Sequence, residues 1–169
     1  MLNIINNLKP FFEDCYRRIN VREYARLIKV SPPTASKMLF EFNKEELLIT
    51  EKDRNYIFYY ANKNNKIFSE LSRIYWKFKI KGLTNFLNKN TTVFTIILFG
   101  SLSKAEVKKD SDIDICIIGQ KKEHNLKVFE NNLKRKIQLF FFDSIKEIKS
   151  SELANNIING YVLEGKLRI

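Results

Sequence analysis

Two short segments in the second half of the chain have the residue types and the spacing that phosphate chemistry needs. An apolar run, 93–99, ends at Gly100-Ser101, and Asp112 follows Gly100 by 12 residues, with Asp114 two positions further on. Glycine lets a backbone turn come close to a ligand, and serine adds a hydroxyl donor. A helix that began at this turn would direct free N–H groups outward, so the sequence predicts a phosphate site.

The two aspartates are candidates for a metal clamp. In a strand, alternation places Asp112 and Asp114 on one face, about 7 Å apart. Mg²⁺ is bound by a few carboxylates together with phosphate oxygens, and Ser103 and Lys104 would add a donor and a positive charge. A Gly-Ser turn alone is usually only a turn, and Asp-x-Asp alone is more often a solvated strand end. Together, between apolar strands, they favour metal-assisted phosphoryl or nucleotidyl transfer.

The elements that must position these residues alternate between strands and helices. Strands are expected at 93–99, 112–118 and 136–142, followed by a helix over 152–160 and a tail, 161–169. This pattern predicts a small mixed-sheet α/β layer within an α+β chain.

The stretch from Gly100 to Asp114 resembles the signature of the polymerase-β-type nucleotidyltransferase superfamily in its minimal form. That signature is Gly-Ser, a small residue, Arg or Lys, Gly, and then Ser-Asp-x-Asp. The chain reads Gly-Ser-Leu-Ser-Lys-Ala and then Ser-Asp-Ile-Asp, so that Ala105 stands where the family has glycine. The segment 155–164 also resembles the family's closing helix and turn, and the resemblance covers roughly residues 82–169.

The resemblance implies transfer of a nucleoside monophosphate from an NTP, with ATP the expected donor, to a hydroxyl or phosphate acceptor. Gly100 and Ser101, with Ser103 and Lys104 beside them, would bind the triphosphate. The resemblance also implies that Asp112 and Asp114 are catalytic and bind Mg²⁺ or Mn²⁺.

A third carboxylate of the family normally comes from the next core strand, and here the chain departs from the pattern. The matching position is Gln138, whose neutral amide cannot act as a base. Asp143 lies five residues further on, about 17 Å along a strand and on the opposite face. NTP binding could therefore survive while transfer slows or stops.

The first 61 residues are expected to form a winged helix-turn-helix. A helix over 2–19 precedes a capping box, Asn20 to Glu23, and a second capped start at Ser31-Pro32-Pro33. Two β-prone runs, 47–50 and 56–60, then surround a polar tip and predict a hairpin. The expected core residues are Tyr24, Ala25, Leu27, Ile28, Ala35, Met38, Leu39 and Phe42. Such a domain joined to a nucleotidyltransferase resembles a group of prokaryotic, often archaeal, proteins.

A connecting helix is expected over residues 62–81, and Gly82 is expected to break it and to open the domain 82–169. Within the connecting helix, one apolar stripe is predicted to face the core. Its members are Ile67, Leu71, Ile74, Tyr75 and Phe78.

The net charge of +11 favours a polyanionic partner, although a generally lysine-rich proteome would also explain it. Residues 1–81 hold 16 Lys and Arg against 9 Asp and Glu, so the first half is the better candidate for double-stranded DNA. The expected DNA contacts are Thr34, Ser36 and Lys37 on the recognition helix and Lys52 and Arg54 at the wing. The alternative is that this domain mediates dimerisation or packs on its neighbour. A regulator of this kind would have a protein partner such as a toxin.

The remaining residues carry fewer signals. Cys15 and Cys116 have no metal spacing and suggest no disulfide, which fits a reducing cytoplasm, the expected location. His124 is expected to be a solvated surface residue. The longest apolar run is far too short to span a bilayer, so no membrane partner is expected.

Overall fold

The computed structural model describes residues 2–167. The chain divides into two compact units, and each is described by itself. The first contains Met1–Ser72 together with the short segment Ala105–Lys109, and the second contains Arg73–Lys104 and Asp110–Ile169. Helix α4 (Lys66–Lys79) begins in the first unit and ends in the second.

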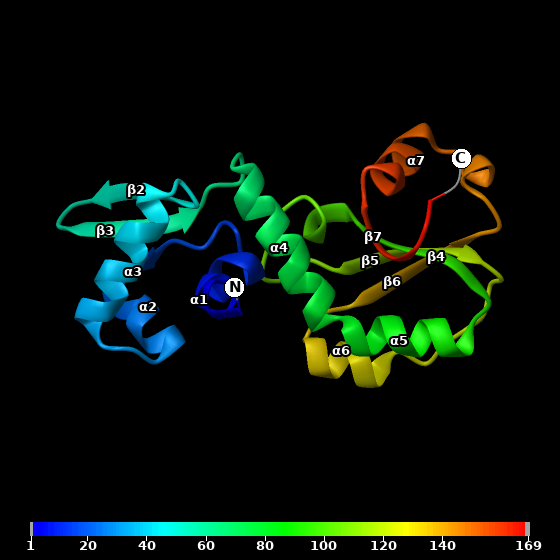
Figure 1. The fold of residues 1–169 in the computed structure, drawn as a ribbon, viewed down its shortest axis with the longest axis horizontal. Coiled ribbons are helices and arrows are strands. Elements are labelled where there is room, and N and C mark those ends of the chain that lie inside the picture. The colour runs from blue at the N-terminus through cyan, green and yellow to red at the C-terminus, as the bar shows by residue number, and fades with distance from the viewer. Residues whose placement is uncertain (1, 168–169) are drawn as a thin grey trace. The chain divides into compact units, whose positions relative to one another are not determined.

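The first unit combines three helices with a three-stranded antiparallel sheet of order β1-β3-β2 (Figure 1). Its elements are α1 (Leu2–Glu13), β1 (Ile19–Asn20), α2 (Val21–Ile28), α3 (Pro32–Lys44), β2 (Leu48–Asp53) and β3 (Tyr56–Ala61).

Local capping explains where these helices begin. The Asn20 side chain accepts a hydrogen bond from the Glu23 N–H at 3.0 Å, and Ser31 accepts one from the Thr34 N–H at 3.4 Å. Both predicted helix starts are therefore confirmed. The prediction that α1 runs to residue 19 is wrong, because Ile19 pairs with Tyr59 in the sheet.

Five of the eight predicted core residues of the first unit are buried, and Ile28 and Met38 are partly buried. Tyr24, Ala25, Ala35, Leu39 and Phe42 are buried, whereas Leu27 is 41% exposed. The buried face of α4 also differs from the predicted stripe, because Ile67 is 64% exposed and Phe78 is 60% exposed. Tyr75 is buried as predicted. The large aromatic side chains Phe68 and Trp76 are fully buried as well, so the buried face is turned by about one residue from the predicted stripe.

The second unit is a four-stranded mixed sheet of order β6-β5-β4-β7. Strands β5 and β6 are parallel, and the other pairs are antiparallel. Its further elements are α5 (Lys81–Asn90), β4 (Val93–Phe99), β5 (Ile113–Gly119), α6 (Lys127–Leu133), β6 (Ile137–Phe142), α7 (Ser151–Ile158) and β7 (Tyr161–Gly165). The three expected strands are confirmed to within one residue. The expected helix break falls at Ile80, between α4 and α5, and not at Gly82, which lies in the first turn of α5.

Helices cover both faces of this sheet. Helices α5 and α6 lie on one face and α7 lies on the other (Figure 1). The core on the α7 face includes Ile97, Phe99, Cys116, Ile118 and Ile157. The alternate residues of β5, Ile113, Ile115 and Ile117, are also fully buried, so β5 is apolar on both sides of the sheet. No helix within residues 2–167 is long and apolar enough to cross a membrane.

Two neighbouring residues of α3 test the packing of the first unit. Leu39 is fully buried, whereas Phe40 is 61% exposed. We expect Leu39→Ala to lower the free energy of unfolding by about 3 kcal/mol, because it leaves a cavity. Phe40→Ala should change it by less than about 0.5 kcal/mol. Urea titration followed by circular dichroism measures both, and equal losses would contradict the burial of Leu39.

Candidate nucleotide and metal site

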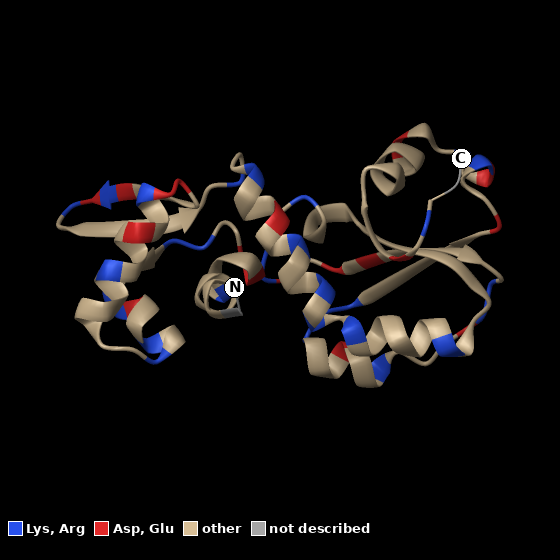
Figure 2. Ribbon diagram, in the orientation of Figure 1, with Lys and Arg blue, Asp and Glu red and all other residues tan. Residues whose placement is uncertain are grey.

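The site begins where β4 ends, next to the first residues of β5. Phe99, the last residue of β4, pairs with Asp114, and Gly100 follows with φ of +69°. A Cβ atom on Gly100 would lie 2.2 Å from Asp114 Oδ2. Glycine is therefore required here twice, for the backbone conformation and for the space that the carboxylate occupies. Figure 2 shows the acidic residues that gather at the start of β5.

Gln138 completes this cluster from the neighbouring strand. It pairs with Asp114 in the parallel β5–β6 register, and its Nε2 donates a hydrogen bond to Asp112 Oδ2 at 2.6 Å. The prediction that Gln138 lies beside both aspartates on one face of the sheet is therefore confirmed. Asp143 follows the far end of β6, where its N–H donates to Glu147, so it cannot replace the missing carboxylate.

The turn after β4 differs from the expected helix start. Residues Gly100–Leu102 form one 3₁₀ turn and not an α-helix, so the backbone amides offered to a phosphate are those of a single turn. Ser101 is partly exposed. Ser103 is fully buried, and its hydroxyl donates to the Gly100 carbonyl at 2.9 Å, which stabilises the turn. Lys104 Nζ donates to Asn156 Oδ1 on α7 at 2.7 Å.

Ala105 explains the family's glycine in physical terms. Its φ is +55° and it is fully buried. Glycine adopts this left-handed conformation freely, whereas alanine loses about 1–2 kcal/mol. The departure from the signature therefore strains the backbone locally but leaves the path of the turn intact.

The electrostatics of the pair favour a cation. Burial, and then the charge of Asp112, raise the pKa of the Asp114 carboxyl above its ordinary value. A divalent ion between the two carboxylates would offset both effects, and these oxygen ligands suit Mg²⁺ or Mn²⁺. Residues 2–167 contain no cluster of three or more His, Cys, Asp or Glu residues, so the protein would supply two carboxylates and the phosphates the remainder.

Two arginines support the site and were not predicted. Arg73 Nε donates to the Ser103 carbonyl at 2.7 Å. Arg135 is 8% exposed, and its Nη1 donates to the Ser111 carbonyl at 2.6 Å, directly before Asp112. These contacts join residues 30 and 24 positions apart, and no local sequence signal indicates them.

The five predicted DNA-contact residues lie in the first unit and are all exposed. Thr34, Ser36 and Lys37 lie in the first part of α3, while Lys52 lies near the end of β2 and Arg54 lies in the β2–β3 turn. Lys44, at the end of α3, shares this exposure and was not predicted.

An acid pair beside a glycine turn, at one end of a mixed four-stranded sheet, defines a nucleotidyltransferase-type domain. The family described as Polymerase beta, Nucleotidyltransferase matches residues 81–166. This match spans more than half of the chain, so the protein belongs to that nucleotidyltransferase family. A comparison with curated proteins gives no match.

Gly100→Ala tests whether the Asp114 carboxylate needs the space that glycine leaves at position 100. The new methyl group would displace Asp114 and strain the backbone, so we expect at least tenfold weaker NTP binding in the presence of Mg²⁺. Gly82→Ala is the matched control, because its Cβ would meet only Phe129 Cε1 at 3.9 Å and alanine favours helix. Calorimetry that gives equal affinities for both variants would refute the requirement for glycine.

Asp114→Asn tests the cost of the buried charge. Because the pKa of Asp114 is raised on folding, the folded chain holds this proton more tightly, and stability from this group rises as pH falls. In metal-free buffer at pH 7 we expect Asp114→Asn to unfold at a higher urea concentration than the wild type. The difference between the two urea midpoints should vanish as pH approaches 3.8, the ordinary pKa of an aspartate carboxyl. A gap that is constant with pH would contradict this explanation.

Proposed function

We propose that the protein is a Mg²⁺- or Mn²⁺-dependent nucleotidyltransferase whose first unit is a DNA-binding winged helix. It would move a nucleoside monophosphate from an NTP, with ATP the expected donor, to a hydroxyl or phosphate acceptor. The observation that carries this proposal is the carboxylate pair of Asp112 and Asp114 held beside the Gly100 turn.

Each part of the site has a role in this reaction. The amides of Gly100–Leu102 and the Ser101 hydroxyl would bind phosphate oxygens. Asp112 and Asp114 would hold the cation, which when bound neutralises charge on the phosphates. The acceptor oxygen forms a bond to the α-phosphorus, the bond to the β-phosphate breaks, and pyrophosphate leaves. The acceptor's proton needs a base, and Gln138 cannot take it.

A second candidate function follows from Gln138. Its amide donates to Asp112 and thereby occupies an oxygen that a cation would use. In this alternative the protein is a DNA-binding regulator, or an antitoxin-like protein with a toxin partner. Its nucleotidyltransferase domain would bind nucleotide with weak or no catalysis.

NTP binding and transfer separate the two candidates. Asp112→Asn combined with Asp114→Asn should abolish metal-dependent NTP binding in calorimetry, whereas Asp143→Asn, at the far end of β6, should not. Wild-type transfer of labelled NTP is expected to be slow. Gln138→Glu should raise it at least tenfold, because it adds a base and a third carboxylate. Gln120→Glu is the control for added charge. Fast wild-type transfer that Gln138→Glu leaves unchanged would show that this position is not the vacant one.

The winged-helix proposal is supported by the order of elements in the first unit. Helix, short strand, two capped helices and a hairpin occur in that order, with β1 paired to β3. The exposed side of α3 carries Lys37 and Lys44, and Arg18 forms ion pairs with Glu51 and Asp53, which reduces the negative charge beside the hairpin turn.

DNA binding by this unit should depend steeply on salt. Each phosphate contact that is lost reduces the steepness of log K against log salt by about 0.9. We expect Lys37→Ala to lower the slope for duplex DNA by about this amount, whereas Lys9→Ala on α1 should not. Fluorescence anisotropy that detects no duplex binding at low salt, for a random-sequence pool, would exclude the DNA partner.

A further inference from the structure

The end of the second unit's sheet that lies away from Asp112 and Asp114 contains two hollows, and the proposed transfer uses neither. Strand β4 begins at this end with Val93, which pairs with Gly119, the last residue of β5. Five steps of strand separate Phe94 from Phe99, a distance of about 17 Å. A ligand at this end is therefore distinct from a phosphate held at the Gly100 turn.

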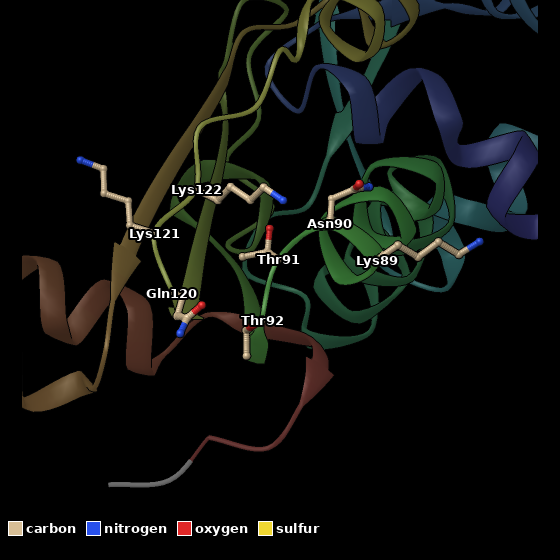
Figure 3. A pocket seen from close by; sticks show the side chains of 7 residues that line it. All are labelled: Lys89, Asn90, Thr91, Thr92, Gln120, Lys121 and Lys122. Carbon is tan, nitrogen blue, oxygen red and sulfur yellow. The ribbon is translucent and has the colours of Figure 1, made fainter.

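The first hollow has a volume of about 340 Å³ and is basic. Its charged lining residues are Lys89, Lys121 and Lys122, and its neutral ones are polar side chains such as Thr91 and Asn90. Figure 3 shows Lys122 extended over Thr91 towards the side on which Asn90 lies. No carboxylate lines this hollow, so it suits a phosphate group.

The second hollow has a volume of about 570 Å³ and an apolar wall. Phe94, Ile118 and Leu167 form that wall, and Asp143 and Ser144 supply polar groups. Phe94 is 67% exposed, so its ring is available to a ligand. An apolar surface beside hydrogen-bonding groups matches the face and the edge of a nucleobase.

The two hollows belong to one end of the sheet. Thr92 lines the first and Phe94 the second, two residues apart on the same chain segment. Likewise Ile118, in β5, lines the second hollow, and Gln120, directly after β5, lines the first. Proteins bind single-stranded nucleic acid without sequence preference by combining cations that follow the backbone with exposed aromatic rings on which bases stack. A duplex offers its phosphates but not the faces of its bases.

We propose that this end of the sheet binds single-stranded nucleic acid, with Phe94 stacked on a base and Lys122 at a neighbouring phosphate. Lys89 and Lys121 flank the phosphate and add charge on either side. The site does not require the transfer reaction, because its residues are separate from the acid pair.

His124 supplies a local spectroscopic probe. It is the only histidine in the sequence, and its Nε2 lies 2.8 Å from Thr91 Oγ1, beside the basic hollow. The ring lies at the surface but packs against Phe86 and is partly buried, so it is less solvated than predicted. Burial, and then the charge of Lys122, lower the pKa of His124. A phosphate next to Lys122 would reverse the second effect and raise the pKa.

The test uses the full chain in EDTA, so that no cation-dependent binding at Asp112 and Asp114 contributes. The probes are a 12-nucleotide single strand of thymidine, its duplex with deoxyadenosine, and inorganic phosphate. Phe94→Ala should weaken single-strand binding at least fivefold, as loss of one stacked base does. Lys122→Ala should also weaken it and lower the salt slope by about 0.7. Phe78→Ala and Lys127→Ala are matched controls, because both residues are exposed in the same unit and lie outside the hollows.

The single strand should also raise the pKa of His124 in NMR titrations of the wild type. Equal effects of Phe94→Ala and Phe78→Ala would overturn the proposal. So would an unchanged His124 pKa, or a duplex whose binding depends on Phe94 as strongly as that of the single strand. If inorganic phosphate raises the His124 pKa while Phe94→Ala leaves oligonucleotide affinity unchanged, the site binds anions only, and base stacking is refuted.

Discussion

The contact between the Asp114 carboxylate and Gly100 is the constraint on which the rest of the second unit depends. It exists only in the register that pairs Phe99 with Asp114. A shift by one residue would turn both aspartates to the opposite face of the sheet, among the apolar side chains that should be there. The fully buried residues Ile113 and Ile115 prevent that shift, because burying them stabilises the present register by several kcal/mol. The buried isoleucines of β5 thus fix the positions of Asp112 and Asp114.

This arrangement destabilises the ionised carboxylate of Asp114. Asp114 is desolvated and lies near a second carboxylate, so its ionised form is disfavoured in the folded chain. The Gln138 amide relieves the negative charge only in part, through one hydrogen bond to Asp112. Arg135 donates to the carbonyl just before Asp112, and its guanidinium lies over the Trp76 ring at 5.0 Å. A cation shared with phosphate oxygens would balance the pair more completely than these neighbours do.

Much of the second unit could be predicted because its signals are local. Apolar runs predicted β4, β5 and β6, whereas β7 lies where a tail was expected. The parity of β6 placed Gln138 beside the aspartates, which the β5–β6 register confirms. Other features depend on contacts distant in sequence. The burial of Ser103 and its bond to Gly100 follow from the tightness of a 3₁₀ turn, where an α-helix was expected. The segment Ala105–Lys109 belongs to the first unit, where Cys15 N–H donates to the Val107 carbonyl at 2.7 Å, and no periodicity indicates such a crossing.

The two candidate functions differ in what the side chain of Gln138 allows, and both require a bound cation and nucleotide at Asp112 and Asp114. A domain that no longer bound nucleotide would be more stable with a neutral residue in place of Asp114, because the ionised carboxylate is desolvated and lies near Asp112. Asp114 carries this cost in the folded chain, which favours ligand binding in the enzyme and in the regulator alike. The enzyme and the regulator differ only in whether a base takes the proton of the acceptor hydroxyl. Gln138 fills the position of a base with a group that can donate but cannot take up a proton, so cation and nucleotide binding can persist where transfer does not.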